Sequence, residues 1–113
     1  MSGYRLTIRH GARIERERFE GLDEAIASLE RHAEEVRAAG PLDGVSALRR
    51  FEPEQRVAAR LELSTGSFLR RRDAGLDVMG DGTLVPYAGG VRRRPLKPDE
   101  RDSPFDAVRG ALR

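Results

Sequence analysis

The chain has 113 residues, a length typical of one domain with a single hydrophobic core, and its formal net charge is only +2. Because it contains no cysteine, disulfide bonds, thiolate metal sites and a cysteine nucleophile are excluded. No apolar run approaches the roughly 20 residues that cross a bilayer, and the N-terminus lacks the apolar block of a signal peptide. We therefore expect a single small cytoplasmic domain over residues 1–113.

Arginine supplies 20 of the 21 basic residues, and Lys97 is the exception. GC-rich codons favour arginine over lysine, so this bias predicts a bacterial source and makes the arginine count alone weak evidence for nucleic-acid binding. The distribution of charge is more informative. Residues 65–98 contain seven basic and three acidic side chains, whereas residues 22–40 contain two basic and five acidic ones. The positive excess therefore falls on predicted strands.

The first 40 residues predict two strands and a helix. Tyr4, Leu6 and Ile8 alternate with polar residues, a pattern typical of a half-buried strand. A turn at 10–12 leads to a charged second strand over 13–19. Residues 22–39 carry an apolar stripe at helical spacing and are followed by glycine and proline, so they predict an amphipathic helix.

The rest of the chain predicts strands joined by short turns, followed by a final helix. We expect strands over 45–51 and 55–64, then a β-hairpin over 75–94. Ser103 and Pro104 are typical of the N-cap and first residue of a helix. The predicted fold is α+β in the order ββαββββα. It is a mainly antiparallel sheet of five to six strands with helix 22–39 packed on one face and a short C-terminal helix.

The hairpin determines the candidate site. Asp81-Gly82 suits a two-residue turn, because both central positions need a positive φ. This register pairs Val78 with Val85 and Leu76 with Tyr87, which places all four side chains on one apolar face. Continued outward, it brings two arginine triplets together at the open end of the hairpin. The candidate anion-binding residues are Arg70, Arg71, Arg72, Arg92, Arg93 and Arg94.

The predicted function is a non-enzymatic binding module that recognises an anionic partner, either nucleic acid or an acidic protein. Arginine forms bidentate contacts with phosphate or carboxylate. In the alternative reading, neighbouring acids such as Asp73 and Asp77 neutralise the cluster, and the chain is a self-associating or protein-binding domain. The surfaces considered for self-association are the strand that contains Pro86, which we expect at a sheet edge, and the sheet face away from the helix. That face is predicted to carry Arg5, Arg9, Arg56, Arg60 and Glu62.

Catalytic and metal chemistry have little support in the sequence. His10 and His32 have no second ligand at a spacing typical of metal sites. No nucleophile elbow is present. The glycine-rich segments 80–82 and 88–90 do not resemble phosphate-binding loops, because no helix is expected directly after either of them. We therefore expect no catalytic residues, no metal and no cofactor.

Overall fold

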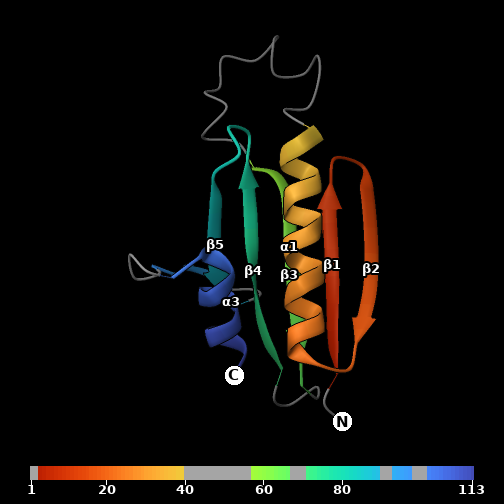
Figure 1. Ribbon diagram of the computed structural model, residues 1–113, viewed down its shortest axis with the longest axis vertical. Coiled ribbons are helices and arrows are strands. Elements are labelled where there is room, and N and C mark those ends of the chain that lie inside the picture. Colours follow the sequence, from red (N-terminus) through yellow and green to blue (C-terminus); the bar gives the residue numbers. More distant parts are fainter. Residues whose placement is uncertain (1–2, 40–56, 67–70, 90–92, 98–101) are drawn as a thin grey trace.

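Six strands form one antiparallel sheet in the computed structural model, which describes residues 3–39, 57–66, 71–89, 93–97 and 102–113. The strand order is β2-β1-β3-β4-β5-β6, and helices α1 and α3 lie side by side on one face of the sheet (Figure 1). The elements are β1 (Tyr4–His10), β2 (Arg13–Phe19), α1 (Leu22–Ala39), β3 (Val57–Thr65), β4 (Arg72–Met79), β5 (Leu84–Ala88), β6 (Arg94–Pro95) and α3 (Pro104–Leu112). The predicted α+β fold and the order ββαββββα are confirmed.

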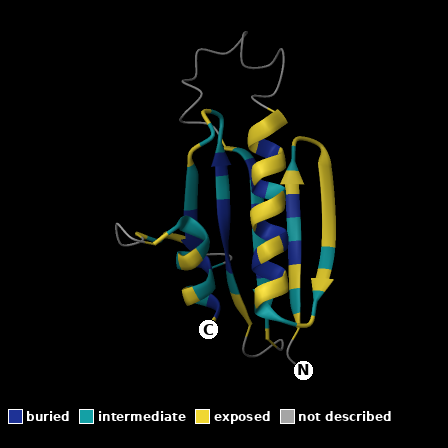
Figure 2. Ribbon diagram, viewed as in Figure 1, coloured by how far each residue is buried: buried dark blue, intermediate teal, exposed yellow. Residues whose placement is uncertain are grey.

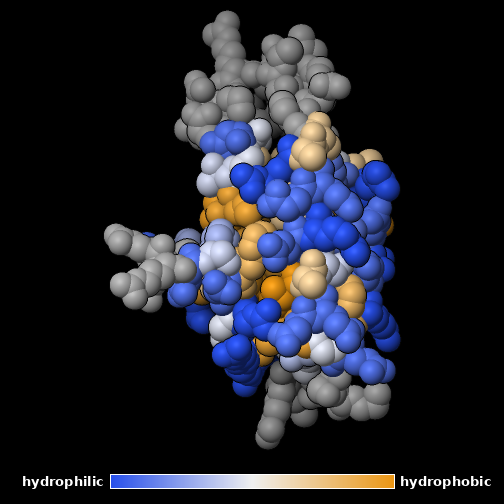
Figure 3. All heavy atoms as spheres, viewed as in Figure 1, coloured by the Kyte–Doolittle hydropathy of each residue, from blue (hydrophilic) through white to orange (hydrophobic). Residues whose placement is uncertain are grey.

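The core lies between the sheet and the two helices. Helix α1 buries the apolar stripe that its sequence predicts, while its other side is exposed (Figure 2). It packs on alternate residues of β1, β3 and β4, among which Leu6, Leu61 and Leu76 are each 0% exposed. Burying one such side chain contributes about 1.5–3 kcal/mol. The outer surface of α1 is hydrophilic, and apolar atoms reach the surface between α1 and α3 (Figure 3).

Helix α3 begins where its sequence predicts. The Ser103 hydroxyl accepts from the Asp106 N–H at 3.2 Å, and the Asp106 carboxylate accepts from the Ser103 N–H at 3.1 Å. This capping box satisfies two N–H groups that the helix itself leaves unpaired. Val108 and Leu112 are buried on the side that faces β4 and β5. The helix thereby covers the half of the sheet that α1 leaves open.

The turn between β4 and β5 has three residues, so the prediction of a two-residue turn is wrong. The Met79 N–H donates to the Thr83 carbonyl at 2.8 Å, and the Gly82 N–H donates to the Met79 carbonyl at 2.9 Å. Gly82 has a φ of 91°, as expected of the glycine that ends such a loop. The Thr83 N–H donates to the Asp81 carboxylate at 2.9 Å, and this hydrogen bond lowers the pKa of Asp81 below its ordinary value.

The extra loop residue shifts the register of the hairpin by one. Leu76 pairs with Pro86 and Gly75 pairs with Tyr87. Because successive side chains of a strand point to opposite faces, this shift moves Val85 and Tyr87 away from the helices. The predicted apolar face of the hairpin is therefore wrong: Leu84, Pro86 and Ala88 take that position instead.

The edges of the sheet differ in part from expectation. Strand β6 lies outside β5, so the strand that contains Pro86 is second from the edge. β6 pairs with Tyr87 and Ala88, and Leu96 donates to the Pro86 carbonyl. Among the described residues, the prediction of an edge strand therefore holds only for the first residues of β5, which have no strand on their outer side. The strand predicted over 45–51 lies outside the described residues.

Candidate functional site

The structure does not pair the two arginine triplets in the predicted register. The β4–β5 ladder ends where Ala74 meets Ala88, before either triplet. Arg94 then belongs to β6, which turns back along β5. Arg70 and Arg92 lie outside the described residues. Binding of an anion by these six arginines stays a prediction.

The remaining members of the set have separate surroundings. Arg71 donates through Nε to the Asp73 carboxylate at 3.0 Å and through Nη2 to the Ser64 hydroxyl at 3.3 Å. Arg72 donates to the main-chain carbonyl of Arg113. The Arg93 guanidinium lies 5.3 Å from the centre of the Tyr87 ring, a distance typical of a cation–π contact.

No described helix covers the other face of the sheet, which we call the open face. Its side chains follow from the strand registers, because directly opposed residues share a face. Three rows cross it from β2 towards β5: Arg18, Arg5, Ser64 and Asp73; Arg16, Thr7, Glu62, Gly75 and Tyr87; and Ile14, Arg9, Arg60, Asp77 and Val85. The charged residues of β1 and β2 on this face are therefore all basic, whereas β3 and β4 carry its acidic residues together with Arg60.

The acidic groups of the open face all have hydrogen-bond partners within it. Arg60 donates to both carboxylate oxygens of Asp77, at 2.7 and 3.1 Å, and this pairing raises the pKa of Arg60. Asp73 accepts from the Ser64 hydroxyl at 2.5 Å. Glu62 accepts from the Tyr87 hydroxyl at 3.1 Å. Each acidic side chain of this half of the face therefore has a hydrogen-bond partner on the face itself.

Four arginines at the other end of the open face have a different environment. Arg5, Arg9, Arg16 and Arg18, which we call the basic strip, are all exposed. Arg5 lies directly opposite Arg18, and Arg9 lies directly opposite Arg60. Among the described residues, none of the four forms an ion pair with a carboxylate. The sequence indicates Arg5 and Arg9 through their alternation in β1. For β2 the sequence does not indicate which side chains face the helices, because its two apolar residues, Ile14 and Phe19, point to opposite faces.

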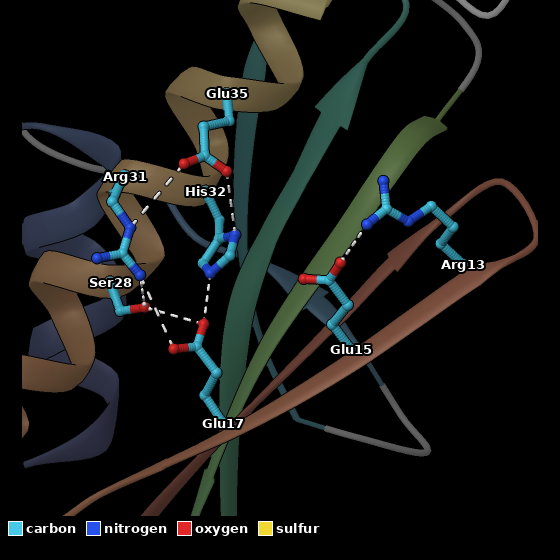
Figure 4. Close-up of polar contacts among 7 residues, drawn as sticks. All are labelled: Arg13, Glu15, Glu17, Ser28, Arg31, His32 and Glu35. Atoms are coloured by element: carbon cyan, nitrogen blue, oxygen red, sulfur yellow. Dashed lines mark hydrogen bonds and ion pairs between the residues drawn. The ribbon is translucent and has the colours of Figure 1, made fainter.

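A second polar cluster lies on the helix side and joins β2 to α1 (Figure 4). Glu17 of β2 contacts His32 Nε2 and accepts from the Ser28 hydroxyl at 3.3 Å, while His32 Nδ1 lies 3.5 Å from Glu35. With both ring nitrogens engaged and its side chain only 13% exposed, His32 has a structural role. It anchors the outer strand to the helix.

A hollow of about 210 Å³ lies beside this cluster. It lies between the β1–β2 hairpin and the last turns of α1, where His10 and His32 both line it. The buried Nε2 atom of His10 has no hydrogen-bond partner among the residues that the structure describes. The described residues contain no group of three or more histidine, aspartate or glutamate side chains placed to hold a metal ion.

No family model, curated protein or solved structure matches this chain. Within the described residues, neither helix is apolar enough over a sufficient length to cross a membrane. A function has to be inferred from the chemistry of the side chains themselves.

Proposed function

We propose that this domain is a non-enzymatic module that binds the phosphate backbone of a nucleic acid through the basic strip on the open face. The observation that carries the proposal is the separation of charge on that face. Its acidic side chains are occupied with partners on β3, β4 and β5, whereas the basic strip has no carboxylate partner among the described residues.

Without a bound anion, repulsion among the arginines of the basic strip destabilises the folded sheet. Like charges directly opposite each other on adjacent strands destabilise a sheet. Arg5 and Arg18 form such a pair, and Arg9 and Arg60 form another, although Arg60 is also paired with Asp77. A bound anion would offset this repulsion, and the planar guanidinium group matches two phosphate oxygens at once.

The surface favours a polymer over a small anion. Adjacent strands lie about 4.8 Å apart and alternate residues about 6.8 Å apart. The four guanidinium groups are therefore spread over a flat area and do not converge on one point. A row of phosphates suits this spacing, and phosphate contacts of this kind require no particular base sequence.

The surroundings favour a duplex over a single strand. Single-strand binding relies on exposed aromatic rings on which bases stack. Among the described residues no aromatic side chain is exposed, and Tyr87 on the open face is only 3% exposed. Glu62, Asp73 and Asp77 would repel phosphates on the other half of the face, which confines the nucleic acid to β1 and β2.

A binding titration at low salt tests this function. Fluorescence anisotropy would follow a labelled DNA duplex, with a single strand of the same sequence and a poly-glutamate peptide as competitors. We expect the protein to bind the duplex. The single strand should displace the labelled duplex only weakly, and the peptide should displace it least. Absence of duplex binding at low salt would overturn the proposal, and preferential competition by the peptide would assign the strip to an acidic protein.

A further inference from the structure

Strand β2 forms one edge of the sheet. Within the described part of the chain it pairs with β1 alone, and most of its length is exposed (Figure 2). An edge strand presents a row of N–H and C=O groups that can pair with another strand. Proteins commonly protect such an edge with charges that repel an approaching copy. In β2 both signs of charge are present, so the outcome depends on the register of the approaching strand.

Three consecutive residues of β2 form a self-complementary pattern. Arg13 and Glu15 lie on the helix side with 79% and 44% of their side chains exposed, and within one copy they form an ion pair at 2.7 Å that pairing with a second copy would replace. Ile14 between them points to the open face and is 49% exposed, more than any other large hydrophobic residue in the part of the chain that the structure describes. A basic residue, an apolar residue and an acidic residue thus follow one another along the free edge.

We propose that two copies of this chain pair antiparallel along β2, with Ile14 opposite Ile14 at the two-fold axis. In this register Arg13 of each copy lies opposite Glu15 of the other copy. Both contacts of opposite charge fall on the helix side, and the contact between the isoleucines falls on the open face. Such an interface is isologous, because each copy contributes the same surface.

The charges of β2 select this register over its neighbours. A two-fold axis through the sheet pairs the central residue with itself. Centring the pair on any residue of 13–18 other than Ile14 places two arginines or two glutamates directly opposite each other, which is destabilising. The Ile14 register has no like-charged pair among its directly opposed residues.

The helices leave room for this arrangement. Helix α1 lies over β1 and β3, and β2 extends beyond it (Figure 1). With strands about 4.8 Å apart, the two α1 axes would lie roughly 19 Å apart across the new seam, compared with about 8–10 Å for helices in contact. Because only about five residues of each copy pair, the dimer is expected to be weak and dependent on concentration. Its formation does not depend on nucleic-acid binding.

Two charge-reversal variants test the proposal by sedimentation equilibrium. The unaltered chain should show a mass that rises with concentration from 12.6 kDa towards twice that value. Arg13→Glu places acids opposite acids, and Glu15→Arg places bases opposite bases, so each variant alone should remain monomeric. An equal mixture of the two restores both opposite-charge pairs and should form the dimer. Glu30→Arg is the matched control for Glu15→Arg, because it makes the same change of charge on the exposed side of α1, away from β2, and it should leave the dimer intact.

The outcomes separate clearly. An unaltered chain that stays monomeric up to millimolar concentration would overturn the proposal, and so would a mixture no more dimeric than either variant alone. Circular dichroism checks that both variants fold. Ile14→Asp provides a second route on the opposite side of the strand: it places two acids at the axis and should also abolish dimerisation, whereas an unchanged dimer would rule out this register.

Discussion

Tyr87 lies across Gly75, the residue directly opposite it on the neighbouring strand, and its hydroxyl donates to Glu62 one strand further on at 3.1 Å. Gly75 pairs with Tyr87 on one side and with Glu62 on the other. The absence of a side chain at Gly75 is what allows the phenol ring to cross the strand. The contact links three strands on the open face, and it leaves Tyr87 only 3% exposed although no described helix covers it.

Replacing Gly75 with alanine should be strongly destabilising. A Cβ atom there would lie 2.1 Å from the Leu61 carbonyl oxygen and 2.9 Å from the Tyr87 hydroxyl, so the strands would have to move apart. We expect Gly75→Ala to lower the free energy of unfolding by about 2–3 kcal/mol, as overpacking in a core does. Urea denaturation measures this change.

Gly110→Ala is the matched control for that experiment. A Cβ at Gly110 meets nothing within 4 Å, and the residue lies in helix α3. Alanine should stabilise the helix there by about 0.5–1 kcal/mol. Equal effects of the two substitutions would contradict the close packing at Gly75.

Ionisation of Tyr87 should be coupled to unfolding at high pH. Burial, followed by the negative charge of Glu62, raises the pKa of Tyr87 well above its ordinary value of 10.0. The folded state therefore holds this proton more tightly than the unfolded state. The contribution of protonated Tyr87 to the free energy of unfolding is therefore fully present below pH 10, and it is lost as the pH rises towards the higher pKa of the folded state.

A Tyr4→Phe variant isolates this titration, because Tyr4 and Tyr87 are the two tyrosines of the chain. We expect the ultraviolet absorbance of the phenolate to appear only at pH values well above 10, together with loss of the circular dichroism of the fold. A phenolate signal near pH 10 from a fully folded protein would show that Tyr87 is accessible to solvent.

The three-residue turn depends on the conformation of Gly82. Its φ of 91° is one that side chains with a Cβ rarely adopt. Gly82→Val should therefore cost about 1–2 kcal/mol, because a branched side chain resists this region most. Gly82→Asn should cost less, since asparagine tolerates positive φ better. Thermal or urea unfolding of the two variants should rank them in this order, and a negligible cost for valine would place the turn elsewhere.

Much of this fold is predictable from local patterns. The stripe of α1 repeats at helical spacing over 18 residues, and the Ser103–Asp106 capping box is a signature of four residues. The strands of 4–10 and 57–65 alternate apolar and polar residues clearly. Each of these signals is complete within one segment, so it needs no information about distant parts of the chain.

The hairpin register was not predictable in the same way. Asp81-Gly82 fits a two-residue turn, but a glycine with a positive φ, such as Gly82, also ends a three-residue loop. The apolar side chains of Val85 and Tyr87 do not decide between the two registers, because each register places them on a different face of the sheet. The burial of Tyr87 on the open face depends on Gly75 and Glu62, which lie on two other strands. The basic strip likewise depends on which side of β2 faces the helix, and the contact between Glu17 and His32 shows that side.

Substitutions within the basic strip should separate binding from folding. Arg16→Gln together with Arg18→Gln removes two charges from exposed positions and relieves the repulsion between Arg18 and Arg5. The free energy of unfolding should stay the same or rise slightly, while affinity for a duplex falls. Arg93→Gln with Arg94→Gln removes the same charge at the opposite edge of the sheet, next to β5, and should affect affinity less. The reverse order would favour the arginines of residues 92–94.

The dependence of duplex affinity on salt tests the central claim most directly. If the four arginines of the basic strip each contact a phosphate, the logarithm of the association constant should fall against that of the salt concentration with a slope of about −3 to −4. The Arg16→Gln, Arg18→Gln variant should reduce the slope by roughly 2. A slope near zero, or one that these substitutions leave unchanged, would contradict binding through the basic strip.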